Sequence, residues 1–369
     1  MTSGQIEIQL IAVVVAVACA LPGTFLVLRR LALVSDAISH SILLGIVLGF
    51  FVVGNVNSPL LLVGAALVGL STVVLVQLLE RTALVREDAA IGLVFPALFS
   101  VGVILISRYA EGVHLDIDAV LLGELAFAPF DRIEFWGWDW GPTGLVVMGV
   151  ILAIDVVAIA VFWKELKLST FDPALAIALG FTPALVQYAL MGLVSLTAVG
   201  AFDAVGSILV VALMIAPPAA AYLLTDSLPR LLVLASAIGA GSGLAGYWVA
   251  YALDASIAGA MATMTGVSFA LAWLFAPGRG LVAAARRRAR QKLEFAQTML
   301  AIHLANHEGK PEAAEESRVD HLNRHLRWAP EFAQRIVRLA ERRGLVRREG
   351  QVLALTQAGR ELAADALAR

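Results

Sequence analysis

Nine apolar runs of about 20 residues constrain this chain more than any other feature of its sequence. They lie at residues 6–28, 32–53, 59–79, 89–107, 142–163, 184–201, 205–224, 230–252 and 257–276. A helix needs roughly 20 apolar residues to cross a bilayer, and backbone groups in lipid must pair within their own segment. The composition agrees, since 60% of the 369 residues are hydrophobic and only 15% are charged. We expect an all-α polytopic membrane protein with about eight or nine transmembrane helices.

The basic residues of the short loops predict the orientation of these spans. One set of alternate loops carries Arg29, Arg30, Arg81, Arg86, Lys164, Lys167 and Arg230, whereas the opposite set carries only Arg108 and Arg132. Lys and Arg accumulate in cytoplasmic loops, so we expect the first set and the C-terminal tail in the cytoplasm. The amino terminus is then outside. The first run has no basic segment before it and is expected to be a retained span rather than a signal peptide.

The charge balance of the chain reverses after Pro277. Residues 1–277 carry 9 Lys and Arg against 18 Asp and Glu, whereas residues 278–369 carry 18 against 11. Such an asymmetry indicates two domains in different surroundings. We expect a transmembrane permease domain at 1–280, a basic juxtamembrane linker at 281–292 that favours anionic lipid, and a small cytoplasmic domain at 293–369. Three amphipathic helices, a hairpin around Glu349-Gly350 and a last helix give that domain a winged-helix (α+β) pattern.

An aspartate and a histidine interrupt the second apolar run, in the stretch LVSDAISHSILLG. Asp36 and His40 are one helical turn apart and therefore share a face. A charged side chain at mid-bilayer costs about 2.5–3.5 kcal/mol on insertion scales, so such residues are rare without a function. A carboxylate and an imidazole without sulfur are a ligand pair that suits Mn, Fe or Zn. The spacing alone also allows an Asp–His pair that satisfies itself and pins neighbouring helices.

Motifs for nucleotide hydrolysis and common enzyme chemistry are missing from the sequence. No GxxxxGK[ST] occurs, and the one Gly-Lys step, Gly309-Lys310, lacks the pattern. HExxH, GxSxG and paired-cysteine motifs are also missing, and Cys19 is the single cysteine. The chain is therefore not expected to be an enzyme. Any ATP hydrolysis must take place in a partner chain.

Several blocks in order resemble the zinc, manganese and iron ABC-transporter permease family over about residues 5–280. They are GTFLVLRRLALVSDAISHSILLGIVLGF, REDAAIGLVFPALFSVGVILIS, FWKELKLSTFDPALAIALGF, AVGSILVVALMIAPPAAAYLLTDSLPRLL and YALDASIAGAMATM. The resemblance implies a multi-pass permease subunit of an ABC importer in a prokaryotic plasma or inner membrane. It implies that divalent Mn, Zn or Fe is transported and that no cofactor is bound permanently. The implied partners are an ABC ATPase subunit, a metal-binding substrate-binding protein and a second permease copy or a related permease.

The resemblance also implies roles for individual residues. Asp36 and His40 match the motif that contacts the ion in the translocation path. The segment STFDPALAIALG matches a helix that couples the permease to its ATPase. Here Asp172 is an N-cap, Pro173 and Ala174 begin the helix and Gly180 ends it. From the residues alone, this segment predicts an ordinary loop helix.

Two further acidic residues lie within or beside the predicted spans. Asp203 is near the outer end of the seventh run and suits either a further metal ligand or a helix-pinning hydrogen bond. Asp155 lies inside the fifth run, and there we favour helix pinning.

From about residue 290 the chain resembles the winged-helix domain of metal-dependent repressors of the diphtheria-toxin-repressor type. The third helix, which enters the DNA major groove in those repressors, carries Arg335, Arg338, Arg342 and Arg343. A fold does not settle a function, and a single copy tied to a membrane reaches DNA poorly. Contact with the ATPase, the permease body or acidic lipid is therefore expected ahead of DNA binding.

Two histidine pairs at helical spacing lie in this C-terminal segment. They are His303 with His307 and His321 with His325, and Glu308, Glu315 and Glu316 are close in sequence. Each pair could present two imidazoles on one helix face and bind cytosolic metal as feedback. Solvated histidines near helix ends are the alternative.

Two other function classes also fit these observations. A membrane-anchored, metal-responsive DNA-binding regulator predicts specific retention of DNA by the tail and no metal accumulation in vesicles. A transporter driven by an ion gradient predicts metal uptake without any ATPase.

Overall fold

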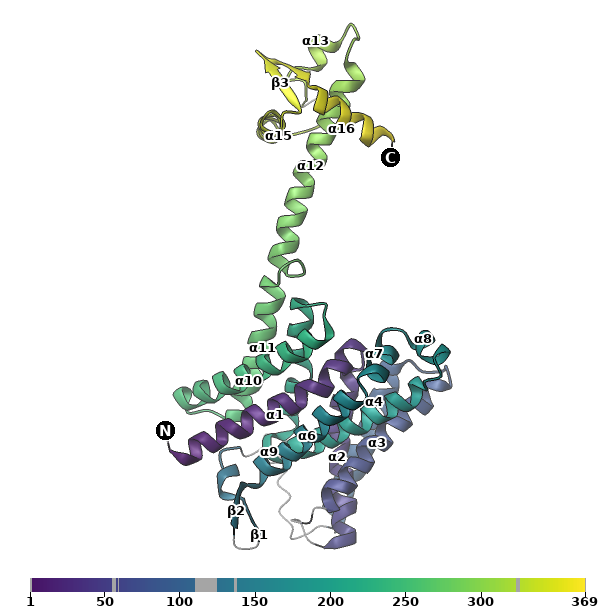
Figure 1. The fold of residues 1–369 in the computed structure, drawn as a ribbon, viewed down its shortest axis with the longest axis vertical. Helices are drawn as coiled ribbons and strands as arrows, with labels where there is room; N and C mark the ends of the chain where they lie inside the picture. Colours follow the sequence, from purple (N-terminus) through teal and green to yellow (C-terminus); the bar gives the residue numbers. More distant parts are fainter. Residues whose placement is uncertain are drawn as a thin grey trace. The chain divides into compact units, whose positions relative to one another are not determined.

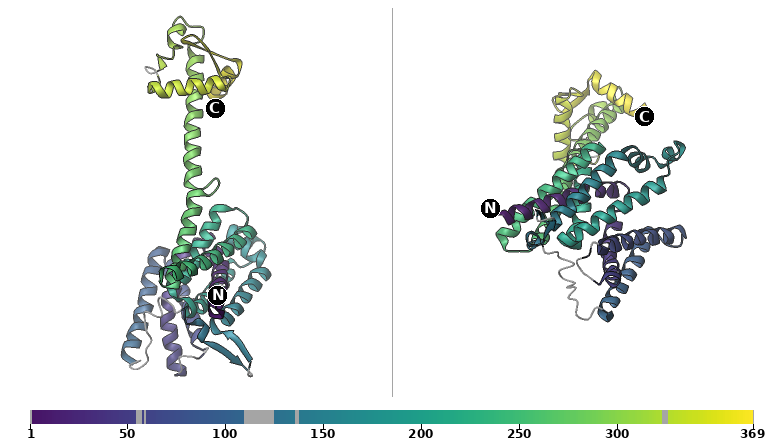
Figure 2. Two further views of the ribbon diagram at one scale, coloured as in Figure 1. Left: turned by 90° about the vertical axis from the view of Figure 1, so that its left-hand side faces the viewer. Right: turned by 60° about the horizontal axis from the view of Figure 1, so that its bottom comes forward.

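The computed structural model describes residues 2–54, 58, 60–109, 125–135, 138–322 and 326–368. The chain divides into two compact units, Met1–Arg279 and Gly280–Arg369. We call them the membrane unit and the C-terminal unit; Figures 1 and 2 show the helices and strands of both. Each unit has its own buried core.

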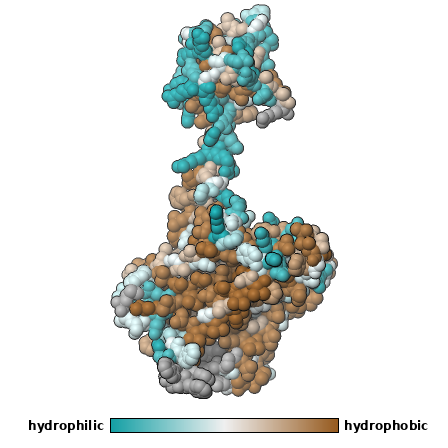
Figure 3. Space-filling model, viewed as in Figure 1, coloured by the Kyte–Doolittle hydropathy of each residue, from teal (hydrophilic) through white to brown (hydrophobic). Residues whose placement is uncertain are grey.

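Eight helices in the described part of the membrane unit are long and apolar enough to cross a bilayer. They are α1 (Ser3–Leu28), α2 (Ala32–Val53), α3 (Leu60–Arg81), α4 (Glu87–Tyr109), α6 (Thr143–Val161), α9 (Pro183–Leu224), α10 (Leu228–Leu253) and α11 (Ile257–Phe275). Hydrophobic side chains also dominate the face of this unit drawn in Figure 3, as a surface in contact with lipid requires. The prediction of a helical, multi-pass membrane protein is confirmed.

Helix α9 contains two of the predicted spans. The sequence predicts separate runs at 184–201 and 205–224, whereas the structure has one helix of 42 residues that is interrupted at Gly206 (φ 77°, ψ 164°). A straight helix of that length would measure about 63 Å, roughly twice the apolar thickness of a bilayer. The backbone at Gly206 is in a region that glycine adopts without strain, and it divides α9 into two arms, 183–205 and 207–224.

The two arms of α9 run through the membrane unit in opposite directions. The first arm starts at the end of α3, where Arg81 donates a hydrogen bond to Tyr188. The second arm ends beside the end of α1, where Ala221 packs in a cluster with Leu28. Helix α3 ends where α1 joins α2, so both ends of α9 lie at one end of the unit. Ala204, next to the interruption, lies instead beside the start of α6. Over the part of the membrane unit that the structure describes, eight helices therefore make nine crossings of the bundle.

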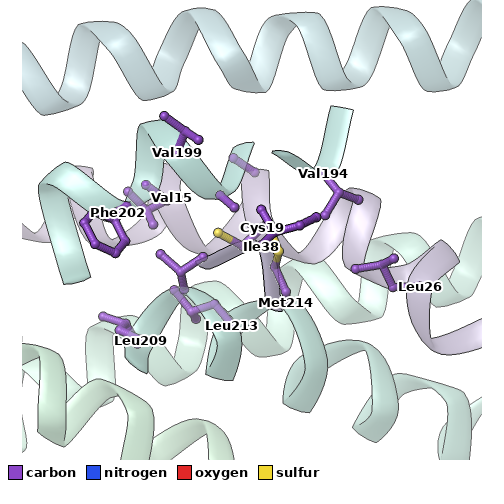
Figure 4. Close-up of a cluster of buried hydrophobic side chains, with 14 of the residues drawn as sticks. Val15, Cys19, Leu26, Ile38, Val194, Val199, Phe202, Leu209, Leu213 and Met214 are labelled. Carbon is purple, nitrogen blue, oxygen red and sulfur yellow. The ribbon is translucent and has the colours of Figure 1, made fainter. Parts of the chain in front are cut away.

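The core of the membrane unit lies between these two arms. Figure 4 shows Val199 and Phe202 of the first arm and Leu209 and Leu213 of the second arm on either side of Cys19 of α1. All five side chains are buried. Cys19 acts here as a small apolar packing residue.

Helices α2 and α3 approach each other closely through glycine. A Cβ atom at Gly45 would lie 2.5 Å from the Cα of Ala65 and 2.6 Å from the carbonyl oxygen of Gly64. Small residues at such contacts are the usual way in which helices associate in lipid. The contact determines which face of α2 is turned toward α3.

A β-hairpin between α4 and α6 is a feature that the sequence patterns do not predict. It follows the short helix η1 (Ala128–Phe130) and pairs β1 (Arg132–Phe135) with β2 (Trp138–Pro142) in antiparallel fashion. Arg132 donates hydrogen bonds to Asp139 at 2.7 Å and to Glu7 of α1 at 3.1 Å. These ion pairs raise the pKa of Arg132 and lower the pKa of Asp139, and they anchor the hairpin to the start of α1.

The C-terminal unit contains four helices and two strands in its described residues. They are α12 (Leu281–His307), α13 (Ala313–Glu316), α15 (Pro330–Arg342), β3 (Val346–Glu349), β4 (Val352–Leu355) and α16 (Gln357–Ala368). The basic segment 281–292 is helical and continuous with the rest of α12. The second of the three expected amphipathic helices, RVDHLNRHLRW, is not formed at 318–321, where the chain makes turns and a β-bridge; residues 323–325 lie outside the described residues.

The two strands of the C-terminal unit form the expected hairpin. Val346 lies opposite Leu355 in the antiparallel register, and Gly350 at the turn has a φ of 68°. An isolated bridge between Arg318 and Val352 adds the segment that follows α13 to this sheet. The core of the unit is formed by one face of α15, the inner faces of the strands, and α12 and α16.

Candidate functional site

The polar pair predicted from the second run lies on the open side of α2. Every side chain from Val34 to Gly45 is buried except those of Asp36 and His40. The side chain of Asp36 is 40% exposed and that of His40 is 31% exposed. Between Val34 and Gly45, the carboxylate of Asp36 and the imidazole of His40 are therefore the side chains that the described chain leaves partly exposed.

The two side chains of this Asp36–His40 pair lie close enough to bind one ion together. Nε2 of His40 is 3.4 Å from Oδ1 of Asp36, as the one-turn spacing predicts. Two aromatic rings of α4 flank the imidazole: Phe95 stacks on it with 5.6 Å between ring centroids, and Phe99 meets it edge-on at 6.2 Å. Aromatic contacts on two sides restrict the rotation of the imidazole and leave Asp36 beside its free edge.

Buried hydroxyl groups hold α2 in this orientation. Ser41 accepts a hydrogen bond of 2.7 Å from Thr72 of α3, and Ser35 lies 3.1 Å from the sulfur of Met214 in the second arm of α9. These contacts are on the opposite side of α2 from the open face. Together with the glycine contact to α3, they fix the helix so that the carboxylate and the imidazole face outward from the chain's own core.

The arrangement supplies two ligand atoms for a dication and little else. A carboxylate oxygen and an imidazole nitrogen are both good donors for Mn²⁺, Fe²⁺ and Zn²⁺, and four to six ligands are usual for these ions. Water or another chain must supply the remaining ligands. Such a sparse site suits an ion that has to be released again.

The structure does not bring Asp203 to this pair. Asp203 is on the first arm of α9, about 12 Å along the helix from Ser195, whose hydroxyl bonds to α3. Among the described residues, Asp203 belongs to no group of three metal-binding side chains. Asp155, in contrast, has a structural partner, since its two carboxylate oxygens accept a hydrogen bond from Thr197 at 3.1 and 3.0 Å. That contact ties α6 to α9.

The segment predicted to contact an ATPase folds as two short helices between α6 and α9. They are α7 (Trp163–Phe171) and α8 (Pro173–Ala178). The carboxylate of Asp172 accepts a hydrogen bond from the backbone N–H of Leu175 at 2.9 Å, and Pro173 and Ala174 open α8. Gly180 follows with a φ of 85°, and its N–H bonds to the carbonyl of Ile177. The local signals of the sequence thus correspond to a capped helix.

Apolar side chains on the surface of α8 and around it are exposed. Ile177 is 64% exposed, Leu179 is 58% exposed and Phe171 is 57% exposed. Arg29, at the end of α1, donates hydrogen bonds to Ser169 and Thr170 and so ties α7 to the bundle. The exposed apolar surface is therefore held in a defined place.

In the C-terminal unit, one of the predicted histidine pairs gains a carboxylate. His303 and His307 of α12 meet Glu316 of α13, and their ligand atoms all lie within 4.8 Å of one another. His321 is 3.4 Å from Glu315 instead. His325, the predicted partner of His321, lies outside the described residues.

The arginines of the helix that matches the DNA-reading helix of the repressors are all exposed. They are Arg335, Arg338, Arg342 and Arg343 of α15 and its C-cap, opposite a buried apolar stripe. Arg343 also pairs with Glu294 of α12 at 3.3 Å. Arg290 also pairs with Glu294, at 2.8 Å. Hydrogen bonds from Arg290, which has the larger effect, and from Arg343 lower the pKa of Glu294.

In its described residues, the membrane unit is a multi-pass bundle with a small polar site on an open helix face and exposed apolar side chains around α8. These are the features of a membrane transport subunit. Residues 6–276 match the ABC 3 transport family. The chain belongs to this family.

Similar proteins extend this result beyond the membrane unit. The zinc transport system membrane protein TroD of Treponema pallidum (strain Nichols) is 53% identical over 357 residues, which cover 97% of this chain and 97% of that protein. The manganese transport system membrane protein MntD of Bacillus subtilis (strain 168) is 50% identical over 270 residues, 73% of this chain and 91% of that protein. The likeness to TroD therefore includes the C-terminal unit.

A solved structure supports the fold of the membrane unit. The structure of PsaBC from Streptococcus pneumoniae in complex with Fab is similar with a TM-score of 0.64 and 27% sequence identity. The similarity covers 76% of this chain and 94% of that chain.

Proposed function

We propose that the chain is the membrane-spanning permease subunit of an ABC importer for divalent transition metal ions, Mn, Zn or Fe. The observation that carries this proposal is the Asp36–His40 pair, the one uncovered part of an otherwise buried helix half. Its donor atoms suit these ions, and the names of the relatives point to zinc and manganese. The chain is a transport subunit rather than an enzyme, because ATP hydrolysis takes place in a partner ATPase.

The exposure of the pair supports a path between two permease chains. A partly exposed carboxylate and imidazole in the lipid region would be costly, so a second copy or a related permease is expected to cover them. The path would then run along the open face of α2, next to Phe95 and Phe99 of α4. A metal-binding substrate-binding protein would deliver the ion from outside.

The surface of α8 supports the expected contact with the ATPase. Its exposed apolar side chains suit a cleft of another protein; Asp172 caps its start, and hydrogen bonds from Arg29 tie the preceding helix α7 to the bundle. ATP binding and hydrolysis in the ATPase would move the segment 172–180. In an alternating-access cycle, this movement would change the side of the membrane that Asp36 and His40 face.

The C-terminal unit is proposed to be a cytoplasmic winged-helix domain. The order of its helices and its β3–β4 hairpin supports that assignment, as does the distribution of Lys and Arg among the loops. The exposed arginines of α15 suit contact with acidic lipid or with an acidic protein surface. We propose these partners ahead of DNA.

Metal uptake by the reconstituted complex tests the proposal. Permease, ATPase and binding protein are placed in vesicles, and uptake of labelled Mn²⁺, Zn²⁺ or Fe²⁺ is compared for wild type, Asp36→Asn and His40→Gln. Asp254→Asn, at an exposed helix end, is the matched control. The rate of uptake should fall at least about 100-fold in the two pair variants and should persist in the control. A 100-fold loss corresponds to an activation free energy higher by about 2.7 kcal/mol.

Other outcomes of this experiment separate the alternatives. Wild-type uptake in both pair variants would show that the ion does not touch these side chains. Uptake without the ATPase would favour an ion-gradient transporter. Specific DNA retention by the full chain together with no uptake would favour a membrane-anchored regulator.

A further inference from the structure

The C-terminal unit brings three metal-binding side chains together where α12 ends. His303 and His307 are one turn apart in α12, and Glu316 is the last residue of α13. One ligand atom from each lies within 4.8 Å of the other two. The imidazole centroids are 4.8 Å apart with a tilt of 55°, and Nε2 of His303 is 3.9 Å from Oε2 of Glu316.

We infer that His303, His307 and Glu316 form a second binding site for a divalent transition metal ion, separate from the transport pair. Two imidazoles and one carboxylate are a donor set that Zn²⁺ and Fe²⁺ sites use, with one or more positions left for water. Ligand bonds of about 2.0–2.2 Å place tetrahedral donor atoms about 3.4 Å apart. The three donor atoms, which lie within 4.8 Å of one another, must therefore approach by at most about 1.4 Å.

The contacts of the nearby acidic residues indicate which carboxylate joins the two histidines. Glu308, next in sequence to His307, is engaged by Arg360, which donates to both of its carboxylate oxygens. Glu315 pairs with His321 instead. Glu316 is thus the carboxylate that the fold turns toward the two imidazoles. His303 is buried and the other two are half-buried, so an ion bound here would be partly shielded from water.

Binding of an ion would replace a contact that the metal-free unit makes. Nε2 of His303 lies 3.2 Å from the backbone carbonyl oxygen of Glu316. When that nitrogen carries the proton of the neutral ring, it donates a hydrogen bond to this oxygen; a metal ion bound to the same nitrogen would require the other tautomer, with the proton on Nδ1.

The ligands come from two segments, so an ion would join them. Helix α13 leads directly into Ser317, whose carbonyl accepts a hydrogen bond of 2.9 Å from Leu353 of β4. An ion held by α12 and Glu316 would therefore link the end of α12 to the segment that extends the hairpin. The inference deepens the proposed function, because under the proposed topology the ion would come from the cytoplasmic pool that the importer fills.

Metal binding to the full chain in detergent tests the site. The Asp36→Ala/His40→Ala variant removes the transport pair, and isothermal titration with Zn²⁺ then measures the number and affinity of the remaining ions. We expect one Zn²⁺ per chain in this background. Adding His307→Gln or Glu316→Gln should weaken binding at least about 100-fold, more than the loss of an outer-shell partner usually costs. His321→Gln is the matched control and should leave the Zn²⁺ bound.

A spectroscopic measurement complements the titration. Co²⁺ in place of Zn²⁺ should give visible absorption bands that His307→Gln changes and His321→Gln does not. Thermal unfolding without metal should be the same for His307→Gln and the control, which excludes loss of fold as the cause. Binding of Zn²⁺ that is unchanged in His307→Gln and Glu316→Gln, or no bound ion in the background variant, would overturn the inference. Uptake assays of Asp36 and His40 variants test the proposed function independently of either result.

Discussion

The contact between Asp155 and Thr197 allows a quantitative test of how the bundle is held together. Asp155 is fully buried in α6, and the Thr197 hydroxyl of α9 is within hydrogen-bond distance of both of its carboxylate oxygens. Thr197→Val keeps the shape of the side chain and removes the hydroxyl. Asp155→Leu removes the carboxylate, and the double variant removes both groups.

The cost of each change follows from what remains buried. Thr197→Val leaves a carboxylate without its hydroxyl partner, a penalty of about 1–3 kcal/mol. Asp155→Leu leaves a hydroxyl that still donates to the carbonyl of Leu193 at 2.9 Å, so its cost should be smaller. The double variant should cost less than the sum of the two. Polar pairs between membrane helices show coupling energies of about 0.6 kcal/mol on average and about 1.7 kcal/mol at most. We expect a value near the upper end, because one partner is an acid.

Thermal unfolding of the purified protein in detergent measures these differences. The expected order of Tm is wild type, then Asp155→Leu, then Thr197→Val, with the double variant no lower than Thr197→Val. Thr263→Val on α11, whose exposed hydroxyl donates to the carbonyl of Gly259 in its own helix, is the matched control. Additive losses in the double variant would show that the two side chains do not stabilise each other, and the assignment of Asp155 as a helix-pinning residue would then be wrong.

Three further predictions concern other parts of the chain. Gly45→Leu should destabilise the membrane unit by about 1–3 kcal/mol, since its Cβ would fall 2.5 Å from the Cα of Ala65; Gly92→Leu, with open space around it, is the control, and equal Tm values would contradict the close contact. Ile177→Asp should abolish co-purification of the ATPase, whereas Leu84→Asp, in another exposed loop, should not; retained ATPase in Ile177→Asp would count against a coupling role for α8. Hydrogen bonds from Arg360 lower the pKa of Glu308, so this pair stabilises the C-terminal unit above the ordinary pKa of a glutamate and the effect is lost as the pH falls through the lowered value. Glu308→Gln should therefore lower the Tm slightly at pH 7 and leave it unchanged in strong acid. A Tm difference between variant and wild type that grows as the pH falls would contradict this role of the pair.

The spans of the membrane unit could be predicted from the sequence because hydrophobic length decides them. The number and order of the apolar runs correspond to the helices, with α9 as the instructive exception. Hydropathy shows that the runs at 184–201 and 205–224 are two spans, but it does not show that a single glycine joins them without a loop. The hairpin at 132–142 is not predictable in the same way, because the ion pair that joins it to α1, between Arg132 and Glu7, links residues that are distant in sequence.

The candidate sites were predictable to the extent that helical spacing determines them. Asp36 with His40 and His303 with His307 are pairs one turn apart, and the structure places each pair on one helix face. The choice of Glu316 over Glu308 and Glu315 depends on the turn after α12 and on Arg360, and neither is visible in a local pattern. The stacking of Phe95 on His40 likewise depends on how α4 packs on α2.

The reversal of α9 at Gly206 also limits what an approaching protein can meet on that side of the membrane. Two antiparallel spans are usually joined by a loop that is exposed to water, and another protein can bind to such a loop. Here the direction changes at Gly206, so no connecting loop separates the two arms of α9. Asp203 is the single charged residue among the 42 residues of this helix. Asp203 is therefore the one charged side chain that α9 offers to a protein that binds at this end of the helix pair.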